Sequence, residues 1–196
     1  MRTRSARAGQ SPPTGAHIDK VFTLVMRLGE RRPAATLPRR LTTLFRELAQ
    51  PEPERDPDDL EDLIWAHWIA HKDLHASNQM AAAIEAIGAG ALDLARPMLD
   101  RLVEKEPRWA EAWNKRATLA FIQKRDADAL ADIEQTLLLE PRHFGAVSGF
   151  GQICLRHDRF AEARAAFQIA LGINPHLLGL REAIEEIGGT PLCQLH

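Results

Sequence analysis

The chain has 196 residues, of which 45% are hydrophobic and 27% are charged, and its formal net charge is -2. This composition is typical of one soluble domain with a continuous core, and the near balance of charge gives no global field that would attract nucleic acid or an anionic membrane. Two cysteines are too few for a disulfide framework, so we expect Cys154 and Cys193 to be free thiols.

Residues 1–17 are predicted to form a disordered basic arm. They contain Arg2, Arg4 and Arg7 without any acidic residue, and they are too polar to bury a core. The segment superficially resembles a targeting leader, but the apolar core of a cleavable signal is missing. Apolar residues at helical spacing follow, so we expect residues 18–41 to form a helix and a linker, and this helix could fold back onto the rest of the chain.

A basic cluster lies in this linker, at Arg31, Arg32, Arg39 and Arg40. It has no interleaved aromatic residues. A solvated linker is the simpler interpretation, and contact with nucleic acid or phospholipid is the alternative.

The next segment is predicted to form two helices joined by a long loop. Apolar residues recur three and four positions apart in both halves, namely Leu41, Leu44, Phe45 and Leu48, then Leu60, Leu63, Ile64, Trp65 and Trp68. The proline-rich stretch 50–57 separates the halves, and Asp56 or Asp58 is placed to cap the second helix.

Three histidines, His67, His71 and His75, lie four residues apart near the end of this second helix. Two or three imidazoles on one helix face could bind zinc or copper. Because no cysteine or carboxylate at matching spacing completes a set of four ligands, we consider the spacing incidental and predict no metal and no cofactor.

A period of 34 residues organises the rest of the chain. Three series keep this spacing, namely Pro107, Pro141 and Pro175, then Ala95, Ala129 and Ala163, and finally Ala83, Ala117 and Gly151. The small residues allow two helices to approach closely, and a proline ends each second helix. The period therefore predicts helical hairpins at 76–109, 110–143 and 144–177. The first helices are expected near 77–88, 111–123 and 145–157, and the second helices near 93–105, 127–139 and 161–173.

This pattern, with Trp113 in the middle unit and Phe160 and Phe167 in the last, resembles the tetratricopeptide repeat (TPR). The resemblance implies an all-α solenoid, a right-handed superhelix of three clear repeats. The domain would cover 42–187, with a degenerate N-terminal repeat at 42–75, a capping helix at 178–187 and a tail at 188–196. The phrases AEAWNKRAT and LLLEPRHFGAVSGFGQI also resemble small bacterial TPR proteins of unassigned role.

The resemblance further implies that the first helix of each hairpin lines a concave groove that receives a partner peptide. The groove positions in this chain are Ser77, Met80, Ala81 and Ile84, then Glu111, Asn114, Lys115, Thr118, Phe121 and Ile122, and finally Ser148, Gln152, Leu155 and Arg156. Asn114, Lys115, Gln152 and Arg156 would be the polar anchors. The alternative is that these residues only form the solvated inner side that any solenoid must have.

One subtype of the family grips the C-terminal carboxylate of chaperones with lysine, asparagine and arginine side chains. Those places are held here by Met80, Ile84, Lys115, Gly145 and Gly149. Only Lys115 could serve, so we do not expect that function.

Arg116 is the most informative departure from the family pattern, because a leucine is usual at its place. A guanidinium that faces the core needs a carboxylate partner. One interpretation is a structural arginine that packs on Trp113 and pairs with Asp132, Asp100 or Glu85, and the other is an arginine available to an anionic group of a bound peptide.

We therefore expect a non-enzymatic scaffold without catalytic residues, which docks a protein or peptide partner in its groove. The alternative function is an accessory or assembly subunit of a larger enzyme or envelope complex, attached through the convex face or the N-terminal helix. We expect no nucleic acid partner and, for want of a run of about 20 apolar residues, no membrane span. A cytoplasmic location follows from these expectations. The oligomeric state and the question whether residues 18–48 fill the groove stay open.

Overall fold

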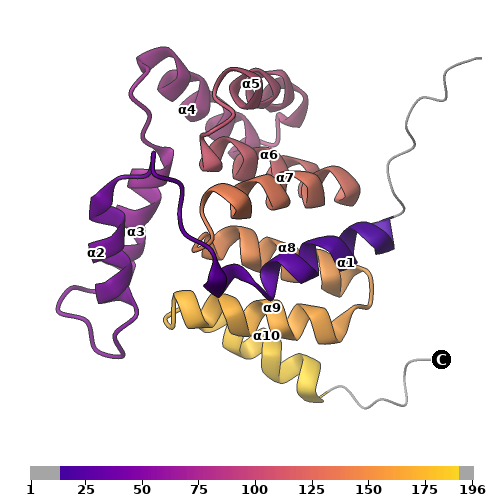
Figure 1. Ribbon diagram of the computed structural model, residues 1–196. Coiled ribbons are helices and arrows are strands. Elements are labelled where there is room, and N and C mark those ends of the chain that lie inside the picture. Colours follow the sequence, from indigo (N-terminus) through magenta and orange to yellow (C-terminus); the bar gives the residue numbers. More distant parts are fainter. Residues whose placement is uncertain (1–13, 190–196) are drawn as a thin grey trace, which may run out of the picture.

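The computed structural model describes residues 14–189, and every regular element in this range is helical (Figure 1). In chain order these elements are α1 (Thr14–Val25), the 3-10 helix η1 (Leu28–Glu30), α2 (Arg39–Leu48), α3 (Pro57–Ile69), α4 (Leu74–Gly88), α5 (Leu92–Lys105), α6 (Ala110–Ile122), α7 (Asp126–Leu139), α8 (Phe144–Arg156), α9 (Phe160–Ile173) and α10 (Leu178–Gly189). The all-α class predicted from the sequence is confirmed.

Three helical hairpins, α4–α5, α6–α7 and α8–α9, form the repeat array. Their boundaries match the predicted ones closely. The largest shift is at α4, which begins at Leu74 because Asp73 accepts a hydrogen bond from the backbone N–H of Ala76 at 3.0 Å and so caps the helix early. The small residues lie where the helices of a hairpin meet. A Cβ atom on Gly151 would come within 2.3 Å of the Phe167 ring, so only glycine fits that position.

Helix α1 packs against α7, α8 and α9 from the outside of the array (Figure 1). It begins at Thr14, so residues 14–17 belong to this helix and not to the predicted disordered arm. His17 explains the earlier start, because its side chain is buried beside Glu134, with 3.9 Å between Nε2 and the carboxylate. Residues 1–13, the remainder of that arm, lie outside the described residues.

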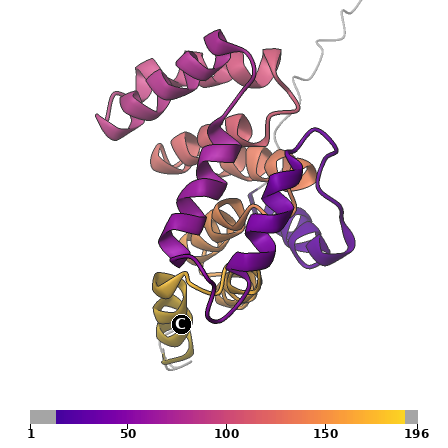
Figure 2. The same ribbon diagram turned by 90° about the vertical axis from the view of Figure 1, so that its left-hand side faces the viewer.

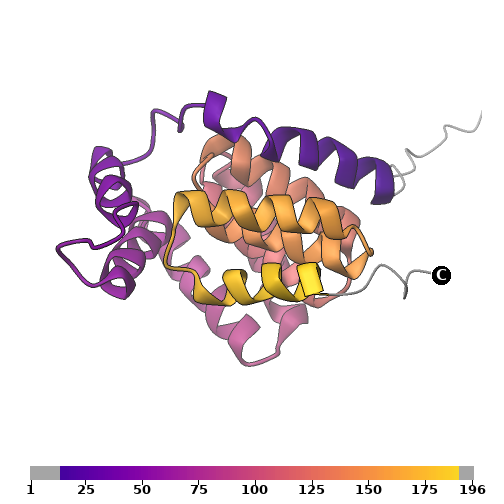
Figure 3. The same ribbon diagram turned by 90° about the horizontal axis from the view of Figure 1, so that it is seen from below.

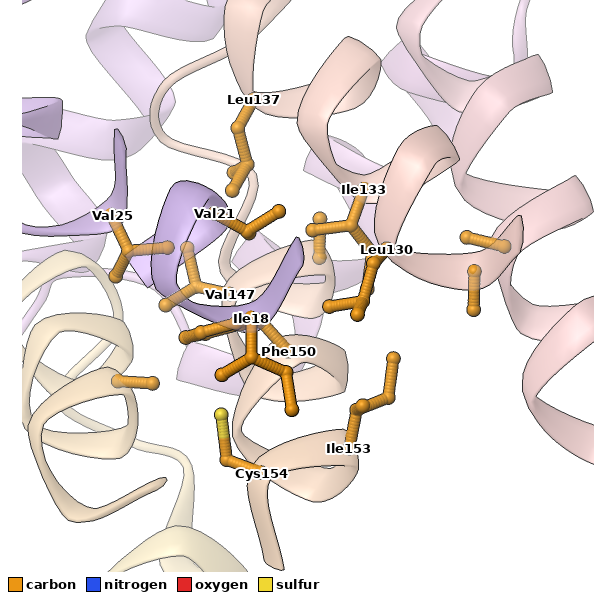
Figure 4. Packing of buried hydrophobic residues seen from close by; sticks show 14 of the residues in the cluster. Ile18, Val21, Val25, Leu130, Ile133, Leu137, Val147, Phe150, Ile153 and Cys154 are labelled. Atoms are coloured by element: carbon orange, nitrogen blue, oxygen red, sulfur yellow. The ribbon is translucent and has the colours of Figure 1, made fainter. Parts of the chain in front are cut away.

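The apolar stripe of α1 and the start of η1 are buried on the array, with Ile18, Val21, Val25 and Leu28 each at most 5% exposed. Figure 4 shows the first three of these side chains pointing toward residues of α7 and α8. Ion pairs hold both edges of α1, because Lys20 contacts Glu134 of α7 at 2.8 Å and Asp19 contacts Arg159 at 2.6 Å. The N-terminal helix therefore covers the outer face of the array at α7 and α9.

Helices α2 and α3 form the predicted hairpin, but this hairpin does not stack on α4–α5 as a fourth repeat. Outside the hairpin, α3 packs mainly on α6, and both helices share a core with residues that begin α8 and end α9. The prediction of a degenerate repeat in line with the others is corrected here. The physical reason is the aromatic face of α3, which finds its partners along the edge of the array.

That edge consists of the loops between successive repeats. Three loop residues spaced by the 34-residue period, Trp109, His143 and Leu177, all contact the hairpin. The Trp109 indole donates a hydrogen bond to the carbonyl of Trp68 at 2.7 Å, the His143 ring stacks on the Trp68 ring at 4.0 Å, and Leu177 packs in the core of the hairpin. Helix α3 thus runs across all three loops like a strap.

Helix α10 covers α9 at the C-terminal end of the array with a row of half-buried apolar residues, Leu180, Ala183, Ile184 and Ile187. Figure 3 shows α10 and α1 on opposite sides of α9. The helix extends to Gly189, two residues past the predicted end, and residues 190–196 lie outside the described residues together with Cys193. Cys154 is a free, buried thiol, as predicted.

Candidate functional site

The first helices of the hairpins, α4, α6 and α8, contact one another along the array, whereas α1 lies between the second helices α7 and α9. The first helices are therefore closer together than the second ones, and they form the inner, concave face. Of the predicted groove residues, Ser77, Met80, Ala81 and Ile84 lie on α4, where Met80 is fully buried, and the others lie on α6 and α8. They divide into a half near the start of these helices and a half near their end.

Trp65 of α3 covers the half near the helix starts. The ammonium group of Lys115 lies 4.9 Å from the centre of the Trp65 ring, a cation–π contact. On α8 the indole rests directly on the backbone, because a Cβ atom on Gly145 would be 2.8 Å from the ring. A predicted polar anchor is thus covered by an aromatic side chain of the same protein.

Beneath Trp65 lies a buried polar network centred on Glu111, whose side chain is fully buried. Its carboxylate accepts hydrogen bonds from the Asn114 amide at 3.2 Å and pairs with the Lys115 ammonium at 3.0 Å. His143 completes the network, with Nε2 at 2.8 Å from the carboxylate. Because the backbone N–H of Ala146 donates to Nδ1 of His143, the ring proton is on Nε2 and is donated to Glu111.

This network keeps Glu111 ionised although it is buried. Burial alone would raise the pKa of Glu111, but the hydrogen bond from His143, together with the charge of Lys115, outweighs burial and holds the pKa below its ordinary value. All polar groups of the network are satisfied internally. Asn114 and Lys115 consequently serve the loop between α7 and α8, and a peptide would have to compete with Glu111 for them.

The half near the helix ends is open. Thr118 and Gln152 are exposed, and Phe121 and Leu155 are half-buried beside them. Ile122, which follows Phe121, is 46% exposed. This half therefore offers hydroxyl, amide and apolar side chains to a ligand.

Two predicted groove residues have internal partners that leave part of each side chain accessible. Ser148 donates its hydroxyl hydrogen to the carbonyl of Phe144 at 2.8 Å, which leaves the oxygen free to accept. Arg156 stacks on the Phe121 ring at 3.8 Å and pairs with Asp126 at 2.5 Å. The charge of Arg156 is therefore balanced within the chain.

Arg116 faces away from the groove and joins three helices. Its guanidinium donates two hydrogen bonds of 2.8 Å to Asp132 of α7 and one of 3.0 Å to Asp100 of α5, and it lies 5.0 Å from the Trp113 ring. The hydrogen bonds that Arg116 donates to the Asp132 carboxylate raise the pKa of Arg116 above its ordinary value. Of the two interpretations, this is the arrangement of a structural arginine.

Replacing Arg116 by methionine should lower the free energy of unfolding by about 2 kcal/mol at neutral pH. The variant leaves Asp132, whose side chain is 5% exposed, without its partner. Loss of a partner from a fully buried pair costs about 3–5 kcal/mol, and the partial exposure of Arg116 reduces that figure. Urea unfolding measures the difference, and Arg101→Met, on an exposed arginine of α5, is the control.

The loss should also depend on pH. Burial raises the pKa of Asp132 above its ordinary value, although Arg116 opposes this effect, and removal of Arg116 raises the pKa further. The charged carboxylate is then the destabilising form, so the loss is full above this folded-state pKa and shrinks as the pH falls through it and Asp132 takes up a proton. A loss of equal size at every pH would contradict this account.

Within residues 14–189, no group of three or more histidine, cysteine or acidic side chains is arranged to hold a metal ion. His71 instead stacks on Trp109 at 4.6 Å, and its Nε2 lies 3.5 Å from Glu106. Across the same range, no helix combines the length and the apolar character needed to cross a bilayer.

The strap contacts are the part of the site that sequence reasoning missed. The signal was present, because Trp109, His143 and Leu177 keep the 34-residue period and are large side chains in loops. Large residues at loop positions need a cover, and Trp65 and Trp68 supply it. The period alone identified the loops but not the segment that packs on them.

Together, the stacked hairpins and the concave inner face define a helical-repeat protein of the solenoid class. A family model described as tetratricopeptide repeat matches residues 80–136 and 127–177, which together span half of the chain. The chain belongs to the tetratricopeptide repeat family. Repeats of this kind generally mediate protein–protein interactions, and proteins built from them are typically non-enzymatic scaffolds.

The chain is also similar to two known proteins that contain tetratricopeptide repeats. A TPR repeat-containing protein of Rhizobium etli is 37% identical over 128 residues, which cover 63% of this chain and 61% of the relative, so the chain spans about three-fifths of the relative's length. The solved structure of the first TPR of Spaghetti, bound to the HSP90 peptide SRMEEVD, superposes with a TM-score of 0.55 at 18% identity. It covers 58% of this chain and 90% of its own, and at this identity the likeness concerns the fold alone.

Proposed function

We propose that the protein is a non-enzymatic scaffold that docks a partner peptide in the open half of its concave groove. The observation that carries this proposal is which surfaces of the repeat array are covered by other helices of the chain and which are exposed to solvent. Helix α1 covers the outer face at α7 and α9, and α3 covers the loops and the starts of α6 and α8, whereas Thr118 and Gln152 on the inner face are exposed. The inner face near the helix ends is thus a repeat surface available to a partner.

The chemistry of this surface supports a partner that is bound through its backbone and its apolar side chains. Thr118 and Gln152 offer hydrogen bonds to peptide groups, and Phe121, Ile122 and Leu155 offer apolar contacts. The cations near the groove are balanced by Glu111 and Asp126, so a peptide that depends on a free C-terminal carboxylate fits less well.

Affinity capture with matched variants tests the proposal. Thr118→Glu/Gln152→Glu places two negative charges on the inner face, and Gln135→Glu/Gln168→Glu places the same two charges on exposed positions of α7 and α9. We expect the inner-face variant to lose partner proteins that the wild-type chain and the outer-face variant retain, as seen by mass spectrometry. The shortest segment of such a partner should then bind the purified wild-type chain at least about tenfold more tightly than the inner-face variant.

The opposite result would favour attachment through the outer face. If the outer-face variant alone loses partners, the groove is not the docking site, and the protein acts as an accessory subunit of a larger complex. Partner sets that are equal for all three chains would contradict docking at either surface.

A further inference from the structure

The α2–α3 hairpin and the linker before it carry unpaired charges of opposite sign at two ends. The basic end consists of Arg39 and Arg40 at the start of α2, with Arg31 and Arg32 in the linker that leads to it, and the acidic end consists of Glu52, Glu54, Asp58 and Asp59. All eight side chains are exposed, and within residues 14–189 none of them forms a salt bridge or a side-chain hydrogen bond. One surface element therefore combines both signs, although Arg55, which pairs with Glu47, lies next to Glu54 and offsets part of its charge.

By contrast, the arginines that hold the repeat array together each have a carboxylate partner within the chain. Arg116 pairs with Asp132, Arg142 pairs with Glu140, and Arg159 contacts Asp19. The basic end thus differs from them, although the chain has slightly more acidic than basic residues. Its charges are free to meet a partner.

The two ends cannot neutralise each other within one molecule. Helix α2 has 10 residues and is therefore about 15 Å long, whereas charges are screened over about 8 Å at physiological ionic strength. Arg39 and Arg40 also occupy the first turn of α2, where positive charge is unfavourable, and Pro38 provides no side-chain cap there. Carboxylates from another molecule would meet two guanidinium groups and a helix N-terminus at once.

We propose that the hairpin is the interface of a homodimer in which the basic end of each copy faces the acidic end of the other. A two-fold axis across the hairpin brings both pairs of ends together in one step, because both signs lie on the same element. The hairpin lies on the outside of the molecule, nearest the viewer in Figure 2, so a second copy has access to it.

Other occupants fit this surface less well. The apolar side of α2 is buried on the array, with Leu41, Leu44 and Leu48 at most 1% exposed, so the helix has no apolar face left to insert into a membrane. The basic end has no aromatic side chain on which bases of a single strand could stack. Unlike a membrane or a single strand of nucleic acid, a second copy supplies an acidic end that matches the basic end in a fixed geometry.

Sedimentation velocity of the full chain at increasing salt concentration tests the proposal through a charge exchange. Arg39→Glu/Arg40→Glu and Glu52→Lys/Glu54→Lys should each lower the association constant at least about tenfold, and salt should weaken the wild-type dimer in the same way. An equimolar mixture of the two variants should associate again, because new Glu–Lys pairs form between them. Arg101→Glu/Arg164→Glu, which makes the same charge change on exposed arginines of α5 and α9, should leave dimerisation unchanged.

Several results would overturn the proposal. These are a chain that stays monomeric at low salt, a dimer that neither variant weakens, and a mixture that does not associate. If the chain is monomeric and Arg39→Glu/Arg40→Glu abolishes binding to vesicles of anionic phospholipid, the basic end serves a lipid surface instead. Far-UV circular dichroism checks the fold, and Arg31→Glu/Arg32→Glu in the linker replaces the first variant if α2 is disturbed.

Discussion

Replacing Trp68 by alanine should lower the free energy of unfolding by about 3–5 kcal/mol, the range found when large aromatic residues are removed from cores. The side chain is 2% exposed and joins the strap to the array. Its ring stacks on His143 at 4.0 Å and packs against Phe144 at 5.2 Å and Phe45 at 5.8 Å. Without it, α3 loses the contact that fixes it over the middle loop.

Urea unfolding followed by circular dichroism measures the loss, and hydrogen exchange locates it. We expect faster exchange in α2 and α3, whereas α8 and α9 keep their protection. Trp113→Ala is the control, because Trp113 is half-buried and contacts Arg116 rather than the strap. Unchanged exchange in α2 and α3 would show that Trp68 does not anchor the hairpin.

The more conservative Trp68→Phe should cost much less than the alanine variant. The indole Nε1 of Trp68 is buried and has no hydrogen-bond partner in the described part of the chain. Phenylalanine retains most of the ring contacts and removes this unsatisfied group, whose burial is itself unfavourable. A loss as large as that of Trp68→Ala would mean that the indole N–H is bonded in solution.

Replacing Val21 by aspartate should detach α1 from the array. Val21 is fully buried between α7 and α8, and a carboxylate there would be surrounded by a cluster of buried hydrophobic side chains. Each buried aliphatic residue of α1 contributes about 1.5–3 kcal/mol to docking, and loss of the helix would remove all of these contributions. We expect a destabilisation of about 3–5 kcal/mol.

Cys154 reports the detachment directly. It lies below Ile18 in Figure 4, and burial raises the pKa of its thiol to about 12, so hardly any reactive thiolate is present while α1 is docked. In a Cys193→Ser background, a thiol reagent should label Cys154 slowly in the wild-type chain and rapidly in Val21→Asp. Met26→Asp, at a position 56% exposed, should stay slow. Slow labelling in both variants would contradict the role of α1 as a cover.

The sequence was sufficient to predict the helices and the repeats, because both depend on local periodicity. It was not sufficient to place α1 and the hairpin, because an apolar stripe shows that a helix needs a cover but not which surface provides it. Asn114 and Lys115 illustrate the limit. Their register on α6 is that of a groove, yet Trp65, some 50 residues earlier in the chain, covers Lys115 there.

Arg116 shows how the missing information changes an interpretation. Its equivalent one repeat later is Phe150, which is fully buried and faces Phe22 of α1, with 6.5 Å between the ring centres. Helix α1 covers the gap between α7 and α9, whereas Arg116 with Asp100 and Asp132 bridges α5 and α7 in the preceding gap. Arginine departs from the family pattern at the place where an ion-pair network takes the role of an apolar cover.

The packing of the α2–α3 hairpin and its linker on later repeats also affects how the chain can fold. A simple repeat array has contacts only between neighbours, so its units can form one after another during synthesis. Here the backbone carbonyl of Leu48 accepts a hydrogen bond from the His176 ring, and the backbone N–H of Ala34 donates one to the carbonyl of Leu139. The first third of the chain therefore leaves the ribosome long before its packing partners exist. The apolar residues of this first third can be buried only after the last repeat has been synthesised. The native state should therefore form late and in one cooperative step.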